Sequence, residues 1–241
     1  TSGTAAITGT TWSVASIALL SGDNILTVTA RDAANNTATA TLTVTYTPDT
    51  TGPALVITSH TNNQSVNISP LTLSGTATDS GLGNNGILSV TVNGVAATGG
   101  TAAGAGTANW SLPLTLSAGA NLITVVAKDN SSGQNATTVT ITINYDATAP
   151  TLAITTPTVN PTLSTSGTPL TSLGGTASDN VAVTQVSWVS NRGTSGTAAI
   201  TGTTWSVASI ALLSGDNILT VTARDAANNT ATATLTVTYT P

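Results

Sequence analysis

The chain has 241 residues, of which 39% are hydrophobic and only 5% charged, and its 9 acidic and 4 basic side chains give a net charge of −5. This composition excludes a charge-rich disordered tail, and the lack of a basic patch predicts no nucleic-acid partner. Polar residues interrupt every apolar run before it reaches the roughly 18 residues of a spanning helix, so we expect no membrane insertion.

The first predicted unit repeats the last one. Residues 1–48 and 194–241 are identical at all 48 positions, and we interpret residues 1–48 as the C-terminal half of a domain that occurs complete at residues 147–241. Either the chain is a window on a continuous array of repeats, or strands from another chain complete the half domain. The absence of Met predicts an internal fragment of a longer protein without a signal peptide.

A different unit, called the A-type unit, is predicted over residues 50–146. Its apolar residues alternate with Thr and other polar residues, which is the pattern of antiparallel strands with one buried and one wet face. No window keeps apolar residues at helical spacing for three turns. The predicted strands lie near residues 54–59, 71–78, 87–93, 95–98, 107–114, 121–128 and 136–145.

The last unit, called the B-type unit, covers residues 147–241 and is a diverged relative of the A-type unit. Both contain a Pro followed by an apolar strand and a segment ending in G-T-A-[TS]-D, at Asp79 and Asp179. Both later contain W-S, a Gly turn and an A-[KR]-D ending, at Asp129 and Asp225. The B-type unit closes with TATATLTVTYT, in which Thr alternates with apolar residues.

Together these patterns predict an all-β protein of tandem antiparallel β-sandwiches with immunoglobulin-like topology. The prediction follows from about seven short strands in each unit of roughly 95 residues, separated by Gly, Asn, Ser and Asp turns. Each unit is large enough to bury its own core. The chain contains no Cys, so neither disulfides nor thiolate metal sites contribute to its stability.

The motifs TTGPALVIT, SGTATD, VTVNG and NLITVVAKD, with their counterparts in the B-type unit, resemble the tandem Ig-like repeats of bacterial surface and secreted proteins. They are also similar to the Ig-like accessory domain of secreted glucan hydrolases. The resemblance covers the whole chain and implies an extracellular or cell-surface location. Because its motifs are turns and core positions, it identifies a fold family better than an activity.

Six of the nine acidic residues occupy matching positions in the two units. In an Ig-like sandwich, the start of the first strand, the turn after the second strand and the turn after the sixth strand lie at the same end. Each unit is therefore expected to gather three carboxylates at a junction between units. Calcium, which takes about six to eight oxygen ligands, is a candidate occupant, with Asn130, Asn180 and Asn228 as further donors. Alternatively, each Asp caps its own turn. The candidate ligands are Asp49, Asp79 and Asp129 in the A-type unit and Asp146, Asp179 and Asp225 in the B-type unit.

No pattern of catalytic residues stands out, and we expect no enzyme. His60 is the single His, and the matching loop of the B-type unit has no equivalent residue, while Glu is absent. Trp110 and Trp205, together with its copy Trp12, recur at one place in the repeats, and Trp188 lies near a third strand. We interpret these Trp residues as core rather than as a sugar-stacking face.

The leading functional hypothesis is a structural segment of an extracellular filament, stalk or adhesin that acts as a stiff spacer or assembly unit. Its expected partners are neighbouring copies of the same repeat, in cis or in trans. The alternative is a carbohydrate-binding accessory module of a secreted enzyme or surface protein, with carbohydrate as the candidate ligand.

Overall fold

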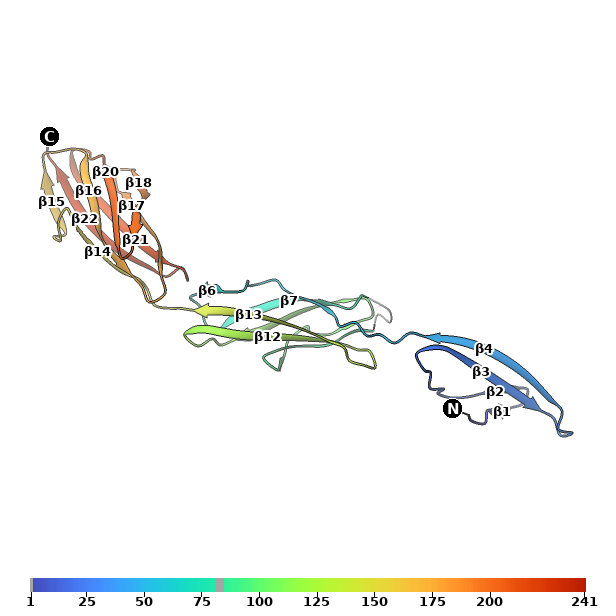
Figure 1. The fold of residues 1–241 in the computed structure, drawn as a ribbon. Helices are drawn as coiled ribbons and strands as arrows, with labels where there is room; N and C mark the ends of the chain where they lie inside the picture. Colours follow the sequence, from blue (N-terminus) through green and yellow to red (C-terminus); the bar gives the residue numbers. More distant parts are fainter. Residues whose placement is uncertain (1, 81–84) are drawn as a thin grey trace.

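The computed structural model describes residues 2–80 and 85–241, and every regular element in them is a β-strand. Figure 1 shows three groups of strands that follow one another along the chain. The predicted all-β class with paired sheets is confirmed. The part of the chain that the structure describes contains no helix with the length and hydrophobicity of a bilayer crossing. The unit boundaries themselves stay a prediction.

The strands of the A-type unit form two sheets around one core. The larger sheet has the order β10-β8-β12-β13-β6, with β9 paired to β8, and the smaller has the order β11-β7-β5. The bounds are β5 Ala54–Ile57, β6 Gln64–Val66, β7 Leu71–Thr78, β8 Gly86–Val92, β9 Val95–Ala96, β10 Ala102–Ala103, β11 Thr107–Leu114, β12 Gly119–Asp129 and β13 Ala136–Tyr145.

All seven strands predicted in the A-type unit are present, and two further strands were missed. Strand β10 has two residues and β6 has three, too few to show an alternating pattern. Strand β6 also pairs with β13 in parallel, so the sheets are not antiparallel throughout. The chain therefore crosses between sheets after β5, because β5 pairs with β7 in the smaller sheet and β6 joins the larger one.

The B-type unit repeats this arrangement. One sheet has the order β14-β16-β20-β19 and the other β15-β22-β21-β17-β18, with β15 parallel to β22. The bounds are β14 Thr151–Thr156, β15 Thr162–Thr165, β16 Leu170–Ser178, β17 Val183–Ser190, β18 Ser195–Thr197, β19 Ala199–Thr201, β20 Thr204–Ile210, β21 Gly215–Asp225 and β22 Thr230–Tyr239.

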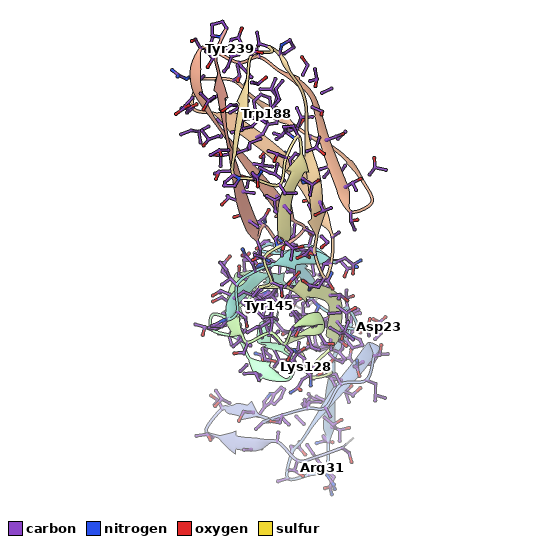
Figure 2. The ribbon with its side chains drawn as sticks, turned by 90° about the vertical axis from the view of Figure 1, so that its left-hand side faces the viewer. Asp23, Arg31, Lys128, Tyr145, Trp188 and Tyr239 are labelled. Carbon is purple, nitrogen blue, oxygen red and sulfur yellow. The ribbon has the colours of Figure 1, made fainter. Side chains whose placement is uncertain are left out.

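The three Trp residues of the complete units lie in the cores, as predicted. The same prediction is wrong for Trp12, which is 55% exposed. Trp110 and Trp205 are buried between the sheets, and Trp188 lies among the side chains of the B-type unit (Figure 2). Trp110 is opposite Gly75 in the register of β11 and β7. A Cβ atom at Gly75 would stand 2.6 Å from the Trp110 ring and 2.0 Å from the Val56 carbonyl oxygen. Only glycine lets this ring and the neighbouring strand approach so closely.

Residues 2–48 contain the same hairpin pairings as residues 195–241. In the described residues, however, their strands lack the further sheet neighbours of the later copies. Strands β1 and β2 pair only with each other, as do β3 and β4, in the part of the chain that the structure describes. The register is that of the B-type unit, with Leu26 opposite Leu42 just as Leu219 is opposite Leu235. The bounds are β1 Ala6–Thr8, β2 Thr11–Ser13, β3 Gly22–Arg31 and β4 Thr37–Tyr46.

Candidate metal centre

Three carboxylates from different parts of the chain meet at the start of the B-type unit. Asp146 follows β13, Asp179 follows β16 and Asp225 ends β21. One oxygen atom from each of the three lies within 4.8 Å of the others. Asp146 and Asp225 are buried and Asp179 is half-buried. The fold thus brings these three predicted residues together.

Each of these side chains also caps a turn, which was the alternative interpretation. Oδ1 of Asp146 accepts a hydrogen bond from the Thr148 amide at 2.9 Å, and Oδ2 of Asp179 accepts one from the Val181 amide at 2.8 Å. Asp225 accepts hydrogen bonds from the backbone and side-chain nitrogens of Asn229, at 2.8 and 2.7 Å. Turn capping fixes the orientation of all three carboxylates.

Capping leaves part of the cluster without a partner. Oδ2 of Asp146 and Oδ1 of Asp179 are buried and accept no hydrogen bond. Water does not readily reach Asp146, because the whole residue is only 5% exposed. Buried oxygens normally have partners, because an unsatisfied one costs free energy. Three ionised carboxylates at this spacing also repel by roughly 3–4 kcal/mol per pair at an effective dielectric constant of about 20. A cation would remove both costs.

The donor set indicates which cation fits. Every side-chain donor in the cluster is a carboxylate oxygen, which is a ligand for hard cations, whereas neither imidazole nor thiolate is available to favour a transition metal. Ca²⁺ accepts carboxylates and backbone carbonyls in flexible geometry. Asp146, Asp179 and Asp225 would hold such an ion, each retaining the hydrogen bond that caps its own turn.

The corresponding acids of the A-type unit are arranged differently. Among the described residues, Asp49, Asp79 and Asp129 do not reach the spacing found in the B-type unit. Asp129 is fully buried, and its two oxygens accept hydrogen bonds from Ser131 and Asn135. Oδ2 of Asp49 and Oδ2 of Asp79 are buried without a partner. The A-type unit therefore satisfies one carboxylate internally and leaves oxygens of the other two unpaired.

Two Asn residues that the sequence analysis did not select connect the turns to the linkers. Nδ2 of Asn229 donates to the Asp225 carboxylate and to the Asp146 carbonyl, at 2.7 and 2.9 Å. Nδ2 of Asn135 likewise donates to Asp129 and to the Asp49 carbonyl, at 2.9 and 3.1 Å. Their shared position, immediately before the last strand of each unit, was the available signal. Asn228, which the sequence analysis predicted as a further calcium ligand, instead accepts a hydrogen bond from Arg224.

We predict a pH dependence in the A-type unit that originates from Asp129. Burial alone would raise the pKa of this carboxyl, but hydrogen bonds from Ser131 and Asn135 outweigh it and hold the pKa below its ordinary value. Its stabilising contribution is therefore complete above the unfolded pKa of about 3.9 and is lost as the pH falls through the lower, folded pKa. Asp129→Asn should flatten the acid limb of the unfolding free energy measured by urea titration. An unchanged acid limb would contradict this prediction.

The remaining candidate residues lie outside this cluster. Nδ1 of His60 is 2.9 Å from Oγ of its neighbour Ser59, and burial lowers the pKa of the imidazole. Trp110 and Trp205 are 1% and 2% exposed, so neither presents a ring face on which a sugar could stack.

Residues 53–145, which include nearly the whole A-type unit, match the family model of glucodextranase domain B. The fibronectin(III)-like modules of Clostridium thermocellum CbhA share 12% identity, with a TM-score of 0.50 over 77% of this chain and 94% of theirs. This likeness establishes a shared sandwich fold.

Two bacterial adhesins are more distant in overall superposition. A Ca²⁺-stabilised adhesin with which an Antarctic bacterium binds ice has 22% identity and a TM-score of 0.42, over 90% of this chain and 56% of that one. A 1.5-MDa bacterial ice-binding adhesin has 22% identity and a TM-score of 0.41, over 90% of this chain and 74% of that one. No curated protein matches the sequence.

Proposed function

We propose that this chain is a non-enzymatic structural segment of an extracellular repeat protein, of the filament, stalk or adhesin kind. In this proposal, A-type and B-type units alternate as a stiff spacer, and Ca²⁺ bound by Asp146, Asp179 and Asp225 stiffens the junction between them. The single observation that carries the proposal is the meeting of these carboxylates, with buried unpaired oxygens, where one unit passes into the next.

Asp146 is the residue through which the ion would act on the junction. Its amide donates to the carbonyl of Val66 in the A-type unit at 2.9 Å. Its own carbonyl accepts from Asn229 in the B-type unit at 2.9 Å. A cation that also held Asp179 and Asp225 would fix this linker residue to two turns of the B-type unit. Bending at the junction would then require breaking metal ligation as well as these hydrogen bonds.

Small-angle X-ray scattering of the chain in Ca²⁺ and in chelator tests the proposal. Calcium should narrow the distribution of interatomic distances and raise the maximum dimension, because a stiff junction samples fewer bent arrangements. Asp179→Asn should abolish this response. Asp216→Asn is the matched control, since Asp216 is exposed and accepts a hydrogen bond from Thr238 in the B-type unit. Identical scattering in both conditions would contradict the stiffening role.

The match of residues 53–145 to glucodextranase domain B supports a second candidate function, a carbohydrate-binding accessory module. The burial of Trp110, Trp188 and Trp205 counts against it, because the Trp side chains of the two complete units are then in the cores and cannot stack on a sugar. Calorimetric titration with a series of glucan oligosaccharides separates the two functions. A saturable heat of binding would favour the carbohydrate-binding accessory module. No heat of binding across the series would favour the structural spacer.

A further inference from the structure

The connection from the A-type unit to the B-type unit contains no spare residue. Asp146 directly follows Tyr145, the last residue of β13. The Asp146 amide donates to the Val66 carbonyl at the end of β6, and the Asp146 carbonyl accepts from Asn229 in the turn after β21. Only the φ and ψ of this single residue lie between the group held by the A-type unit and the group held by the B-type unit.

The connection that enters the A-type unit is longer. Tyr46 ends β4 as Tyr145 ends β13, but Thr47 and Pro48 stand between Tyr46 and Asp49. Asp49 and Asp146 are equivalent, because each lies four residues before a Pro. A B-to-A connection therefore contains two residues that an A-to-B connection lacks.

Hydrogen bonds show which unit holds each end of the longer connection. In the complete B-type unit, the copy of Thr47 is Thr240, and its amide donates to the Thr165 carbonyl in β15 at 3.0 Å. The Asp49 carbonyl accepts from Asn135 of the A-type unit at 3.1 Å. The dihedral angles of three residues, 47 to 49, thus lie between the held groups, and proline fixes only its own φ among them.

The facing ends of the units also differ in chemistry. Ala227, in the turn after β21, is 2% exposed although it belongs to neither core, and it lines a cleft together with Val66 and Ile68 of the A-type unit. In the B-type unit, the positions of Val66 and Ile68 hold Thr165 and Gly167. The equivalent turn of the A-type unit reads NSSGQ over residues 130–134, without an apolar side chain. Only an A-to-B junction therefore offers apolar contact between the units.

We propose that the A-to-B junction is a fixed joint and the B-to-A junction is a hinge, so that an array of these units moves as rigid pairs, each an A-type unit followed by a B-type unit. The inference rests on the proposed alternation of the two units but not on bound calcium. At a B-to-A junction, the two further residues lengthen the connection by roughly 6 Å. The following A-type unit can then turn without breaking the hydrogen bonds at either end.

Distances between paired spin labels measure both junctions, and the chain has no Cys to interfere with labelling. The chain is extended after Pro241 by a second copy of residues 49–146, which places a complete B-type unit between two A-type units. Labels are attached through Thr232→Cys and through Thr140→Cys in one A-type copy or the other, since both positions are exposed. In chelator, the distance distribution across the B-to-A junction should be at least about twofold wider than that across the A-to-B junction, given the longer connection.

Exchanging the two connections tests the cause of the difference. Inserting Thr-Pro after Tyr145 should widen the A-to-B distribution, and deleting Thr240 and Pro241 should narrow the B-to-A distribution. Inserting the same two residues after Val159, which is 77% exposed in a loop of the B-type unit, is the matched control and should change neither.

The outcomes separate this inference from the proposed calcium role. Equal widths in chelator, or widths that do not follow the exchanged residues, would overturn the joint and the hinge. A difference that appears only in Ca²⁺ would also overturn them and would leave the calcium role intact. A difference in chelator that Ca²⁺ does not enlarge would support the inference and count against the calcium role alone.

Discussion

Trp205→Ala is expected to lower the unfolding free energy of the B-type unit by about 3–5 kcal/mol, the usual loss when a large buried aromatic ring is removed. Trp205 lies in the core of this unit and is 2% exposed. Neighbouring backbone is held in sheet pairings on both sides of Trp205, by β16 and by β19. The surroundings therefore cannot collapse fully into the cavity.

The repeat supplies an unusually close control for this experiment. Trp12→Ala makes the same change in the same local sequence, but the Trp12 ring is mostly exposed. Its effect on the unfolding free energy should therefore stay within about 0.5 kcal/mol. Scanning calorimetry of both variants measures the transition of the B-type unit directly. Equal destabilisation by the two substitutions would mean that local sequence, and not burial in the sandwich, determines the contribution of this Trp.

Calcium is expected to raise the melting temperature of the B-type unit by roughly 10 °C or more when present at about 100 times its dissociation constant. A ligand that binds only the folded state adds about 2.7 kcal/mol at that excess. Each kcal/mol corresponds to about 4–8 °C for a domain of 60–100 residues. Calorimetry in chelator, in Mg²⁺ and in Ca²⁺ measures the shift, and Ca²⁺ should exceed Mg²⁺ because the site offers flexible carboxylate ligation.

Asp179→Asn separates metal binding from turn capping. The variant should lose the response to Ca²⁺ because one charged ligand is gone. In chelator it should be at least as stable as the parent chain, since the repulsion among the three carboxylates is reduced while an amide oxygen can still accept from Val181. Asp216→Asn should retain the full response. A parent chain indifferent to Ca²⁺, together with a destabilised Asp179→Asn variant, would mean that the cluster consists of turn caps alone.

The sequence left two roles open for the Asp residues, calcium binding and turn capping. In the structure these roles concern different oxygen atoms of the same side chains. In Asp146 and Asp179, one oxygen accepts a backbone amide and the other is buried without a partner. Capping therefore orients each carboxylate, and its second oxygen is the one available to a cation. Spacing along the chain identifies the residue but does not distinguish its two oxygens, which is why the sequence could not choose between the roles.

The sequence by itself determined the strands, their faces and the repeat. Alternation of Thr with apolar residues assigns each position of a strand such as β22 to the wet or the buried face, because successive side chains point to opposite sides. The same reasoning located all seven predicted strands of the A-type unit. It missed β6 and β10, whose two or three residues are held by neighbouring strands and carry no pattern of their own.

Only the tertiary structure decided which of two equivalent groups of acids comes together. The capping Asn lies six residues after Asp129 but four after Asp225, and the longer turn brings Ser131 onto the Asp129 carboxylate. Likewise, identical sequences leave Trp12 exposed and bury Trp205. For the Trp residues the deciding groups come from other strands. For the acids, the cluster forms because the fold brings together Asp146, Asp179 and Asp225 from three separate segments.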